Sequence, residues 1–367
     1  MTIDSGEVVE KRVENLRKLI KKHKLTGLLI TSPENRRYFS GFEAIDPSLN
    51  ESSGCLLITL KKLHLLTDSR YTESALAEAP LYTVGEGGRR WAKTVASLIG
   101  KTGLLGVEDH YLTLAGFNEL KNAFGQTEIK PAPFNPSSLR VSKTPSELAL
   151  IVKALRITEK AISLLWDQFK PGTTEKWAAF FLDRHFKELG GEGPAFETIV
   201  AAGKRASLPH AVPGSKKLTS QEMVVIDCGA RYRGYASDIT RTLVGEKPLE
   251  WQKLIYRTVR EAQLKALEVI GPGVPACEVD LAARNHIAQA GFGDYFGHSL
   301  GHGVGLAVHE EPSLNSVSKV PLPVGAVVTI EPGIYIPGKG GVRLEQLVEI
   351  TENGRKILNS DLHFYEF

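Results

Sequence analysis

The sequence has only three cysteines among its 367 residues, and this scarcity excludes a fold that depends on disulfide bonds. Cys55, Cys228 and Cys277 are odd in number and far apart in the chain. Disulfide frameworks of secreted domains use many closely spaced cysteines, so this pattern is typical of a reducing compartment. We therefore expect a cytoplasmic protein without disulfide bonds.

Long apolar runs and a large excess of one charge are missing as well. No apolar segment approaches the about 20 residues of a membrane-spanning helix, and the first residues lack the basic-then-apolar order of a signal peptide. The 45 lysines and arginines nearly balance the 42 aspartates and glutamates, which leaves a net charge of +3. Neither nucleic acid nor a membrane surface is therefore an expected partner.

The chain has the length and composition of two globular domains. Its 367 residues, 42% of them hydrophobic, exceed what one core usually covers. Prolines within 131–136 interrupt regular structure, and Thr144 and Glu147 then form a capping box that predicts the start of a long helix. We expect one domain over residues 1–140 and a second over residues 141–367.

The two domains differ in their predicted secondary structure. In the first, an amphipathic helix is followed by strands that alternate with helices, which is typical of a small α/β domain. Its strands are expected at 27–31, 55–59 and 64–67. The second domain is predicted to be α+β around a central antiparallel sheet. Its helices are expected near 174–189, 249–270 and 277–290, and its strands at 223–227, 236–243, 327–331 and 347–350.

Two aspartates flank a predicted hairpin in the second domain. Asp227 ends the apolar strand that begins at Met223, and Asp238 lies on the returning strand. A turn near Tyr232 and Arg233 would place the two carboxylates opposite each other. Opposed carboxylates repel, so a buried pair needs a cation, a shared proton or separate partners. A surface pair beside a turn explains these two residues alone equally well.

A glycine-rich segment further along contains three of the ten histidines. His298, His302 and His309 all lie within residues 297–310. Glycine lets the backbone approach a ligand closely, and neutral imidazole is a good ligand for divalent metals. A single histidine of this kind is more often structural, whereas three in one loop favour a ligand-binding site.

Carboxylates also follow or interrupt two more apolar strands. Glu331 comes directly after the apolar strand 327–330, and a buried carboxylate without a partner is costly. Arg343 and Glu345 alternate with apolar residues, so both should face one side of a strand, where an exposed ion pair between them would contribute little. Four carboxylates and one histidine suit a pair of Mn²⁺ or Co²⁺ ions better than a structural zinc site.

Together these segments resemble the pita-bread metallopeptidases, and specifically the aminopeptidase P and prolidase branch, which cleaves Xaa-Pro bonds. The resemblance covers nearly the whole chain. Residues 35–42 and 68–71 are similar to the creatinase-type N-terminal domain. In the second domain it rests on the two aspartates, on His302 between glycines, on Glu331-Pro-Gly and on Arg343-Leu-Glu.

The resemblance implies five metal ligands. Asp227 would bind one metal ion, His302 and Glu331 would bind the other, and Asp238 and Glu345 would bridge the two. The ions would be Mn²⁺ or Co²⁺, with Zn²⁺ as a further candidate in a crystal. A hydroxide shared by the two ions would attack the scissile carbonyl, and Glu331 would take its proton.

The resemblance also implies catalytic and substrate-binding residues. His210 would contact the substrate, although its local sequence alone gives no such indication. His309 would stabilise the tetrahedral intermediate or move protons. His298 and Arg343 would line the substrate pocket, and Tyr335 would support it.

Two residues beside the ligands are expected not to bind metal. Relatives usually have Asp after the last glutamate, where this chain has Gln346. Its side chain should face away from Glu345, so metal binding should survive, although the local charge or packing could differ. Cys228 follows Asp227, but alternation along the strand should turn its side chain towards the core.

Several related functions remain as alternatives. A methionine aminopeptidase would share the ligands but usually lacks the first domain, and creatinase works without metal and lacks the full ligand set. A non-catalytic binding relative would have lost ligands that are all present here. The short first domain and the length favour a Xaa-Pro aminopeptidase that acts on peptides, and the family resemblance implies a homodimer. The alternative is a Xaa-Pro dipeptidase, which the run at 293–302 resembles.

Overall fold

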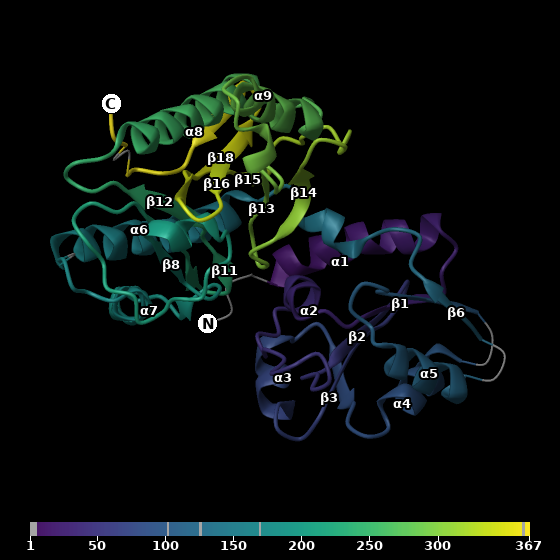
Figure 1. The fold of residues 1–367 in the computed structure, drawn as a ribbon. Coiled ribbons are helices and arrows are strands. Elements are labelled where there is room, and N and C mark those ends of the chain that lie inside the picture. The colour runs from purple at the N-terminus through teal and green to yellow at the C-terminus, as the bar shows by residue number, and fades with distance from the viewer. Residues whose placement is uncertain (1–5, 101–102, 125–126, 169, 362–363) are drawn as a thin grey trace. The chain divides into compact units, whose positions relative to one another are not determined.

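The computed structural model describes residues 6–100, 103–124, 127–168, 170–361 and 364–367. It divides the chain into two compact units, Met1–Arg140 and Val141–Phe367 (Figure 1). Each unit has its own sheets and its own hydrophobic core. The units are therefore described separately.

Unit 1 contains a six-stranded mixed sheet in the order β4-β3-β2-β1-β5-β6. The middle strand β2 is antiparallel to both of its neighbours, and the remaining neighbouring strands are parallel. The strands are β1 (Gly27–Ile30), β2 (Cys55–Thr59), β3 (Leu63–Thr67), β4 (Thr83–Glu86), β5 (Leu104–Val107) and β6 (Glu128–Pro131). The helices are α1 (Gly6–Lys22), α2 (Pro33–Ser40), α3 (Thr72–Glu78), α4 (Trp91–Ile99) and α5 (Leu114–Ala123), followed by the 3-10 turn η1 (Pro136–Arg140).

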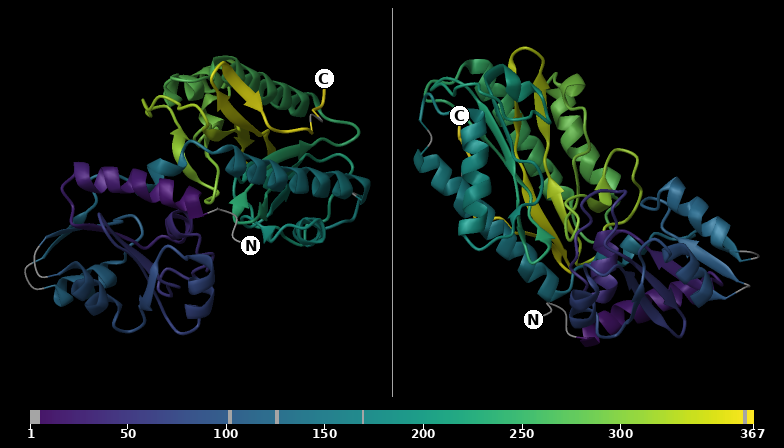
Figure 2. Two further views of the ribbon diagram at one scale, coloured as in Figure 1. Left: turned by 180° about the vertical axis from the view of Figure 1, so that it is seen from behind. Right: turned by 90° about the horizontal axis from the view of Figure 1, so that it is seen from below.

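The long helices of unit 2 follow the sequence pattern closely. They are α6 (Pro145–Gln168), α7 (Glu175–Glu188), α8 (Glu250–Val269) and α9 (Ala276–Gln289). The predicted capping box is present at the start of α6, because the Thr144 amide donates to Glu147 Oε2 at 2.9 Å and the Glu147 amide donates to Thr144 Oγ1 at 3.3 Å. Figure 2 shows the strands of unit 2 between the pair α6 and α7 and the pair α8 and α9.

The strand pairs of unit 2 are all antiparallel, as the sequence predicts. One three-stranded sheet joins β8 (Ile199–Ala202), β9 (Val224–Cys228) and β12 (Ile239–Leu243), and another joins β7 (Gly193–Pro194), β10 (Ala230–Tyr232) and β11 (Tyr235–Ala236). The five-stranded sheet has β13 (Gly301–Gly303), β14 (Glu310–Leu314), β15 (Val327–Ile330), β18 (Gln346–Thr351) and β19 (Gly354–Ile357). The pair β16 (Gly333–Ile336) and β17 (Gly340–Arg343) completes the set, with 3-10 turns η2 (Gly203–Ser207) and η3 (Gly293–Tyr295).

The core of unit 2 lies between helices α8 and α9 and the strands that they cover. Ile255, Val279, Ile330 and Val348 are all fully buried in one cluster. Burying aliphatic side chains of this size contributes about 1.5–3 kcal/mol each, so this cluster holds the strands firmly in place. Strands β15 and β18 end or begin beside Glu331 and Glu345, and the core therefore fixes the backbone at both carboxylates.

Candidate active site

The hairpin that carries the two aspartates turns one residue later than the sequence analysis proposes. Tyr232 pairs with Tyr235, so the turn lies at Arg233 and Gly234, which both have positive φ angles, of 46° and 75°. Such angles belong to the two-residue hairpin turn that favours glycine. Asp227 consequently lies opposite Thr240. The expected direct opposition of Asp227 and Asp238 is therefore wrong.

The shifted register still brings the two aspartates to one face of the hairpin. Asp238 is two residues from Thr240, and side chains alternate along a strand, so both aspartates project to the same side. Carboxylate oxygens of Asp227, Asp238 and Glu345 all lie within 4.8 Å of one another. Asp238 and Glu345 are buried, at 5% and 1% exposure. The alternative of a surface pair beside a turn is thereby excluded.

The carboxylate cluster has the properties of a site for a cation. Asp227 Oδ1 and Glu345 Oε1 are buried and have no hydrogen-bond partner, and a buried charged oxygen without a partner is costly. Burial and the negative charges of Glu345, Asp227 and Glu331 raise the pKa of Asp238 well above its usual range. Burial and neighbouring acids raise the pKa of Glu345 in the same way. A bound divalent cation would relieve both penalties, so these residues fit a metal ion.

The histidine loop lies against the same cluster. Ring or carboxylate atoms of Asp238, His302 and His309 form a second group within 4.8 Å. His302 Nε2 lies 3.2 Å from Glu331 Oε1, and the two histidine rings are 4.2 Å apart. His309 is expected from the sequence to act in catalysis, yet its position also suits a metal ligand. The structure therefore brings all five expected ligand residues and His309 together.

Arg343 projects into the cluster from the end of β17. It forms a salt bridge with Asp227, and its Nε donates to Thr240 Oγ1 at 3.0 Å. Thr240 Oγ1 in turn donates to Glu345 Oε2 at 2.9 Å. The ion pair between Arg343 and Glu345 that the sequence analysis considers is thus replaced by a pair with Asp227. Arg343 is 3% exposed, so its charge acts on the cluster with little screening by water.

The expected substrate-pocket residues are linked to one another through the Tyr335 hydroxyl. Arg343 Nη1 donates to this oxygen at 2.8 Å, and His298 Nε2 lies 2.9 Å from it. Burial raises the pKa of Tyr335 to about 12, so the hydroxyl stays protonated at neutral pH. Tyr335 therefore joins the two residues that the sequence analysis expects to line the substrate pocket.

His210 lies outside the ligand clusters, in the loop between β8 and β9. His210 is exposed. The carbonyl oxygen of the neighbouring Pro209 accepts a hydrogen bond from Arg343 Nη1 at 3.4 Å. The loop thus touches the cluster through its backbone. A role for His210 in substrate binding stays a prediction.

Gln346 and Cys228 are both buried next to the expected metal ligands. Gln346 is 1% exposed and Cys228 is fully buried. Burial, together with the neighbouring carboxylates, raises the pKa of the Cys228 thiol well above its usual value, so the thiol is an unreactive packing group. Neither group of potential metal ligands among the described residues includes Cys228, and the expectation that the Gln346 side chain faces away from Glu345 stays a prediction.

Sequence reasoning missed the residues that hold the ligands in place. Thr329 Oγ1 donates to Glu331 Oε1 at 2.9 Å. Arg241, which is 2% exposed, donates to the Glu345 carbonyl at 2.7 Å and pairs with Asp361 at 3.2 Å. The alternation along the strand after Asp238 places Thr240 on the ligand face, which could have been read from the sequence. The partnership with Asp361 spans a long stretch of chain and carries no local signal.

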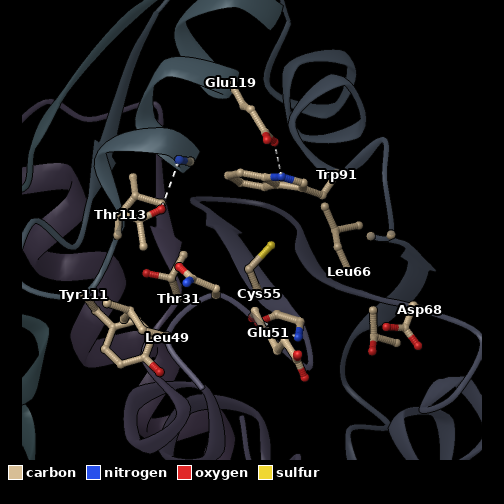
Figure 3. A pocket seen from close by; sticks show the side chains of 18 of the residues that line it. Thr31, Leu49, Glu51, Cys55, Leu66, Asp68, Trp91, Tyr111, Thr113 and Glu119 are labelled. Carbon is tan, nitrogen blue, oxygen red and sulfur yellow. Dashed lines mark hydrogen bonds between the residues drawn. The ribbon is translucent and has the colours of Figure 1, made fainter. Parts of the chain in front are cut away.

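Unit 1 contains a separate cavity of about 720 Å³ (Figure 3). Asp68 and Arg70, from the motif at 68–71, are among its lining residues, and Trp91 Nε1 donates to Glu119 at 2.7 Å. The two groups of potential metal ligands found among the described residues both lie in unit 2. The chemistry suggested by the sequence therefore belongs to unit 2.

The chain belongs to metallopeptidase family M24. Residues 149–352 match the model of that family, and residues 12–141 match the creatinase/prolidase N-terminal domain. The match confirms the resemblance and the fold class inferred from the sequence. Members of this family are metal-dependent peptidases, so the protein is a hydrolase that uses divalent metal.

Several named relatives span nearly the same length as this chain. It is 38% identical to a Xaa-Pro dipeptidase of Pyrococcus furiosus, over 95% of this chain and 98% of the relative. A solved Xaa-Pro dipeptidase from Bacillus anthracis superposes with a TM-score of 0.89 at 34% identity, covering 96% of this chain and 98% of the other. A solved X-Pro aminopeptidase from Thermotoga maritima gives 0.86 at 36% identity, covering 95% and 97%.

Within the described part of the chain, no helix combines the length and the apolar character that crossing a bilayer demands.

Proposed function

We propose that this protein is a Xaa-Pro dipeptidase, which hydrolyses dipeptides whose second residue is proline. The observation that carries metal-dependent hydrolysis is the buried cluster of Asp227, Asp238 and Glu345 beside His302, with two carboxylate oxygens that lack hydrogen-bond partners. The names of full-length relatives at 38% identity support the dipeptidase better than the aminopeptidase that sequence length favours. A dipeptide substrate also suits the resemblance of 293–302 to prolidases.

Two divalent metal ions, Mn²⁺ or Co²⁺, are proposed to occupy the cluster. Asp227 would hold one ion, His302 and Glu331 the other, and Asp238 and Glu345 would bridge them. Bound metal of this kind polarises a carbonyl and lowers the pKa of bound water to near neutrality. The oxygen-rich donor set, with one imidazole, favours Mn²⁺ over a structural zinc ion.

The chain's own groups are proposed to handle protons and to orient the substrate. Glu331, held by Thr329 at 2.9 Å, is the carboxylate that takes a proton from the attacking water. His309, beside His302, donates to the carbonyl oxygen as negative charge develops there. Arg343 and His298, joined through Tyr335, line the side of the cluster where the substrate lies.

A paired hydrolysis assay tests the proposed substrate class. The protein is incubated with Mn²⁺ and either the dipeptide alanylproline or the tripeptide alanylprolylglycine, with alanylglycine as a proline-free control. Cleavage of alanylproline alone supports the dipeptidase. Cleavage of the tripeptide at the same bond contradicts it, and indicates the aminopeptidase instead.

A Xaa-Pro aminopeptidase is the second candidate. Its support is the X-Pro aminopeptidase of Thermotoga maritima, which superposes with a TM-score of 0.86. Both activities need the same metal cluster and differ in whether the site accepts chain beyond proline. We further propose that the chain works as a cytoplasmic homodimer, with residues 141–367 carrying the catalytic residues.

A further inference from the structure

In the proposed function, the loop between β8 and β9 holds the exposed His210 in a defined place beside the substrate. Residues 203–214 begin with η2, carry His210 and run back towards α7. A side chain on a loose loop would contribute little to binding, because each substrate molecule would have to order it first. What anchors this loop therefore matters for the proposed function.

Both ends of the loop converge on one buried carboxylate. Glu175, the first residue of α7, has no exposed surface. Its Oε1 accepts the amide hydrogen of Ala202 at 2.9 Å, and its Oε2 accepts that of Gly214 at 2.8 Å. A carboxylate in the first turn of a helix is also favoured by the helix dipole. Glu175 thus closes the base of the loop.

Arg205 braces the loop from inside. Its Nε donates to both oxygens of Glu175, at 3.1 and 3.0 Å, and its Nη2 donates to the Val212 carbonyl at 2.5 Å. Val212 is two residues beyond His210. The planar guanidinium therefore ties the buried carboxylate to the backbone next to the histidine, which a lysine could not do at both points.

The opposite side of the loop rests against the strand that leads to the metal cluster. A Cβ atom on Gly341 of β17 would lie 2.4 Å from the Ala206 carbonyl oxygen, so η2 and β17 are in close contact. Arg343, at the end of the same strand, donates to the Pro209 carbonyl at 3.4 Å. The loop is therefore fixed on two sides, with His210 next to the second contact.

We propose that Glu175 and Arg205 are positioning residues that hold His210 against the substrate. The inference rests on the proposed function, in which His210 contacts the dipeptide. Glu175 belongs to neither group of potential metal ligands among the described residues, and both residues contact the backbone of the loop directly.

A double-mutant cycle tests this role. The variants are Glu175→Gln, His210→Ala and the two combined, assayed on alanylproline with saturating Mn²⁺. Residues of one network are energetically coupled, so Glu175→Gln is expected to raise KM about tenfold with kcat within about twofold. In the His210→Ala background it is expected to change KM no further. Arg205→Lys, which keeps the charge but not the two-point contact, is expected to show an intermediate KM.

The control variant is Glu188→Gln. Glu188 lies at the other end of the same helix, where it pairs with Arg184 and its side chain is 46% exposed. Its KM is expected to match that of the wild type. If Glu175→Gln raises KM by the same factor with and without His210, the two residues act independently and the inference is overturned. The same conclusion follows if His210→Ala leaves both constants unchanged, and hydrolysis itself then still stands.

A second measurement needs no turnover. Hydrogen exchange of peptides from residues 203–214 is expected to be faster in Glu175→Gln than in the wild type, with exchange in α8 unchanged. This readout remains informative if the protein cleaves no Xaa-Pro substrate, so failure of the proposed function is seen separately. Unchanged hydrogen exchange across residues 203–214 overturns the inference. Faster exchange throughout the chain shows that Glu175→Gln has lost its fold, and the same measurement is then made on Arg205→Lys.

Discussion

At the scale of single residues, the site is defined by acids that are buried close together without enough partners. Asp227, Asp238 and Glu345 approach within 4.8 Å, although like charges in a site of low polarity repel one another. The protein compensates in part with Arg343, Thr240 and His302. The two oxygens that remain without partners are the ones that a metal ion can satisfy.

Neutralising one of the acids proposed to bridge the metals should remove both metal binding and activity. Asp238→Asn and Glu345→Gln are each expected to lower turnover of alanylproline below detection, because an amide is a far weaker ligand than a carboxylate. Bound metal per chain, measured by elemental analysis, should fall in parallel. Glu349→Gln, on the same strand β18 as a matched control, should behave as the wild type. Near-normal turnover by either site variant contradicts the dinuclear assignment.

His309 is expected to act in catalysis rather than in metal binding. His309→Ala should reduce kcat by about 10²–10⁴, the usual contribution of a positioned proton donor, while the metal content stays unchanged. The experiment is informative because the ring lies in a group with Asp238 and His302. A loss of metal together with activity would show that His309 is a ligand.

The residues of the site could be predicted from the sequence in part. Acids at the ends of apolar strands, such as Asp227 and Glu331, can be identified from the sequence. A buried strand end seldom carries a charge unless the charge has a partner or a function. The register between Asp227 and Thr240 was not predictable to one residue, because Arg233 adopts a positive φ that glycine or asparagine would have signalled more clearly.

At the scale of elements, long helices and buried strands were predictable and short edge strands were not. Helix α8 spans Glu250–Val269 against the predicted 249–270, since its apolar period is clear over five turns. Strand β4 (Thr83–Glu86) and strand β6 (Glu128–Pro131) lie at the two sheet edges of unit 1 and are largely exposed, so their sequences lack the apolar signal. Helix α2 was not predicted, because several of its buried residues are polar and give no apolar periodicity.

The C-terminal segment stabilises β12 and the start of β18, which lie next to Asp238 and Glu345 in the chain. Asp361 pairs with buried Arg241, and Glu159 of α6 accepts the amides of Ser360 and Asp361 at 2.7 and 3.0 Å. Arg241 also donates to the Glu345 carbonyl. The segment therefore links α6 to the backbone at Glu345.

Removing the charge of Asp361 should therefore destabilise unit 2. Asp361→Asn is expected to lower the free energy of unfolding by about 2 kcal/mol, since it leaves the buried Arg241 guanidinium without its carboxylate. Urea denaturation followed by tryptophan fluorescence measures the loss. The control is Glu250→Gln in the exposed pair with Lys253, which should leave the free energy of unfolding nearly unchanged. Equal shifts in the two variants would exclude a special role for the segment.

At the scale of the whole molecule, the potential metal ligands are concentrated in one of the two compact units. Every potential ligand of the two groups found among the described residues belongs to Val141–Phe367. Unit 1 has its own core, around Leu29, Leu57 and Leu105, and its own cavity. Metal binding should thus change the stability of unit 2 and leave that of unit 1 unaffected.

Added metal should stabilise unit 2 selectively. At a free Mn²⁺ concentration of about 100 times Kd, mass action adds about 2.7 kcal/mol to the stability of the binding unit. Hydrogen exchange should slow in β9, β12, β15 and β18, and remain unchanged in β1, β2 and β5. Equal protection of both sheets, or none, would contradict a metal site confined to unit 2.

The most direct test of the central claim is the rate of alanylproline hydrolysis by chelator-treated protein as Mn²⁺ is titrated back, with Asp238→Asn measured in parallel. We predict no turnover without metal, a saturable rise that follows the metal bound per chain, and no recovery in the variant. Turnover by the metal-free protein, or full recovery in the variant, would contradict a peptidase whose activity depends on metal held by this cluster.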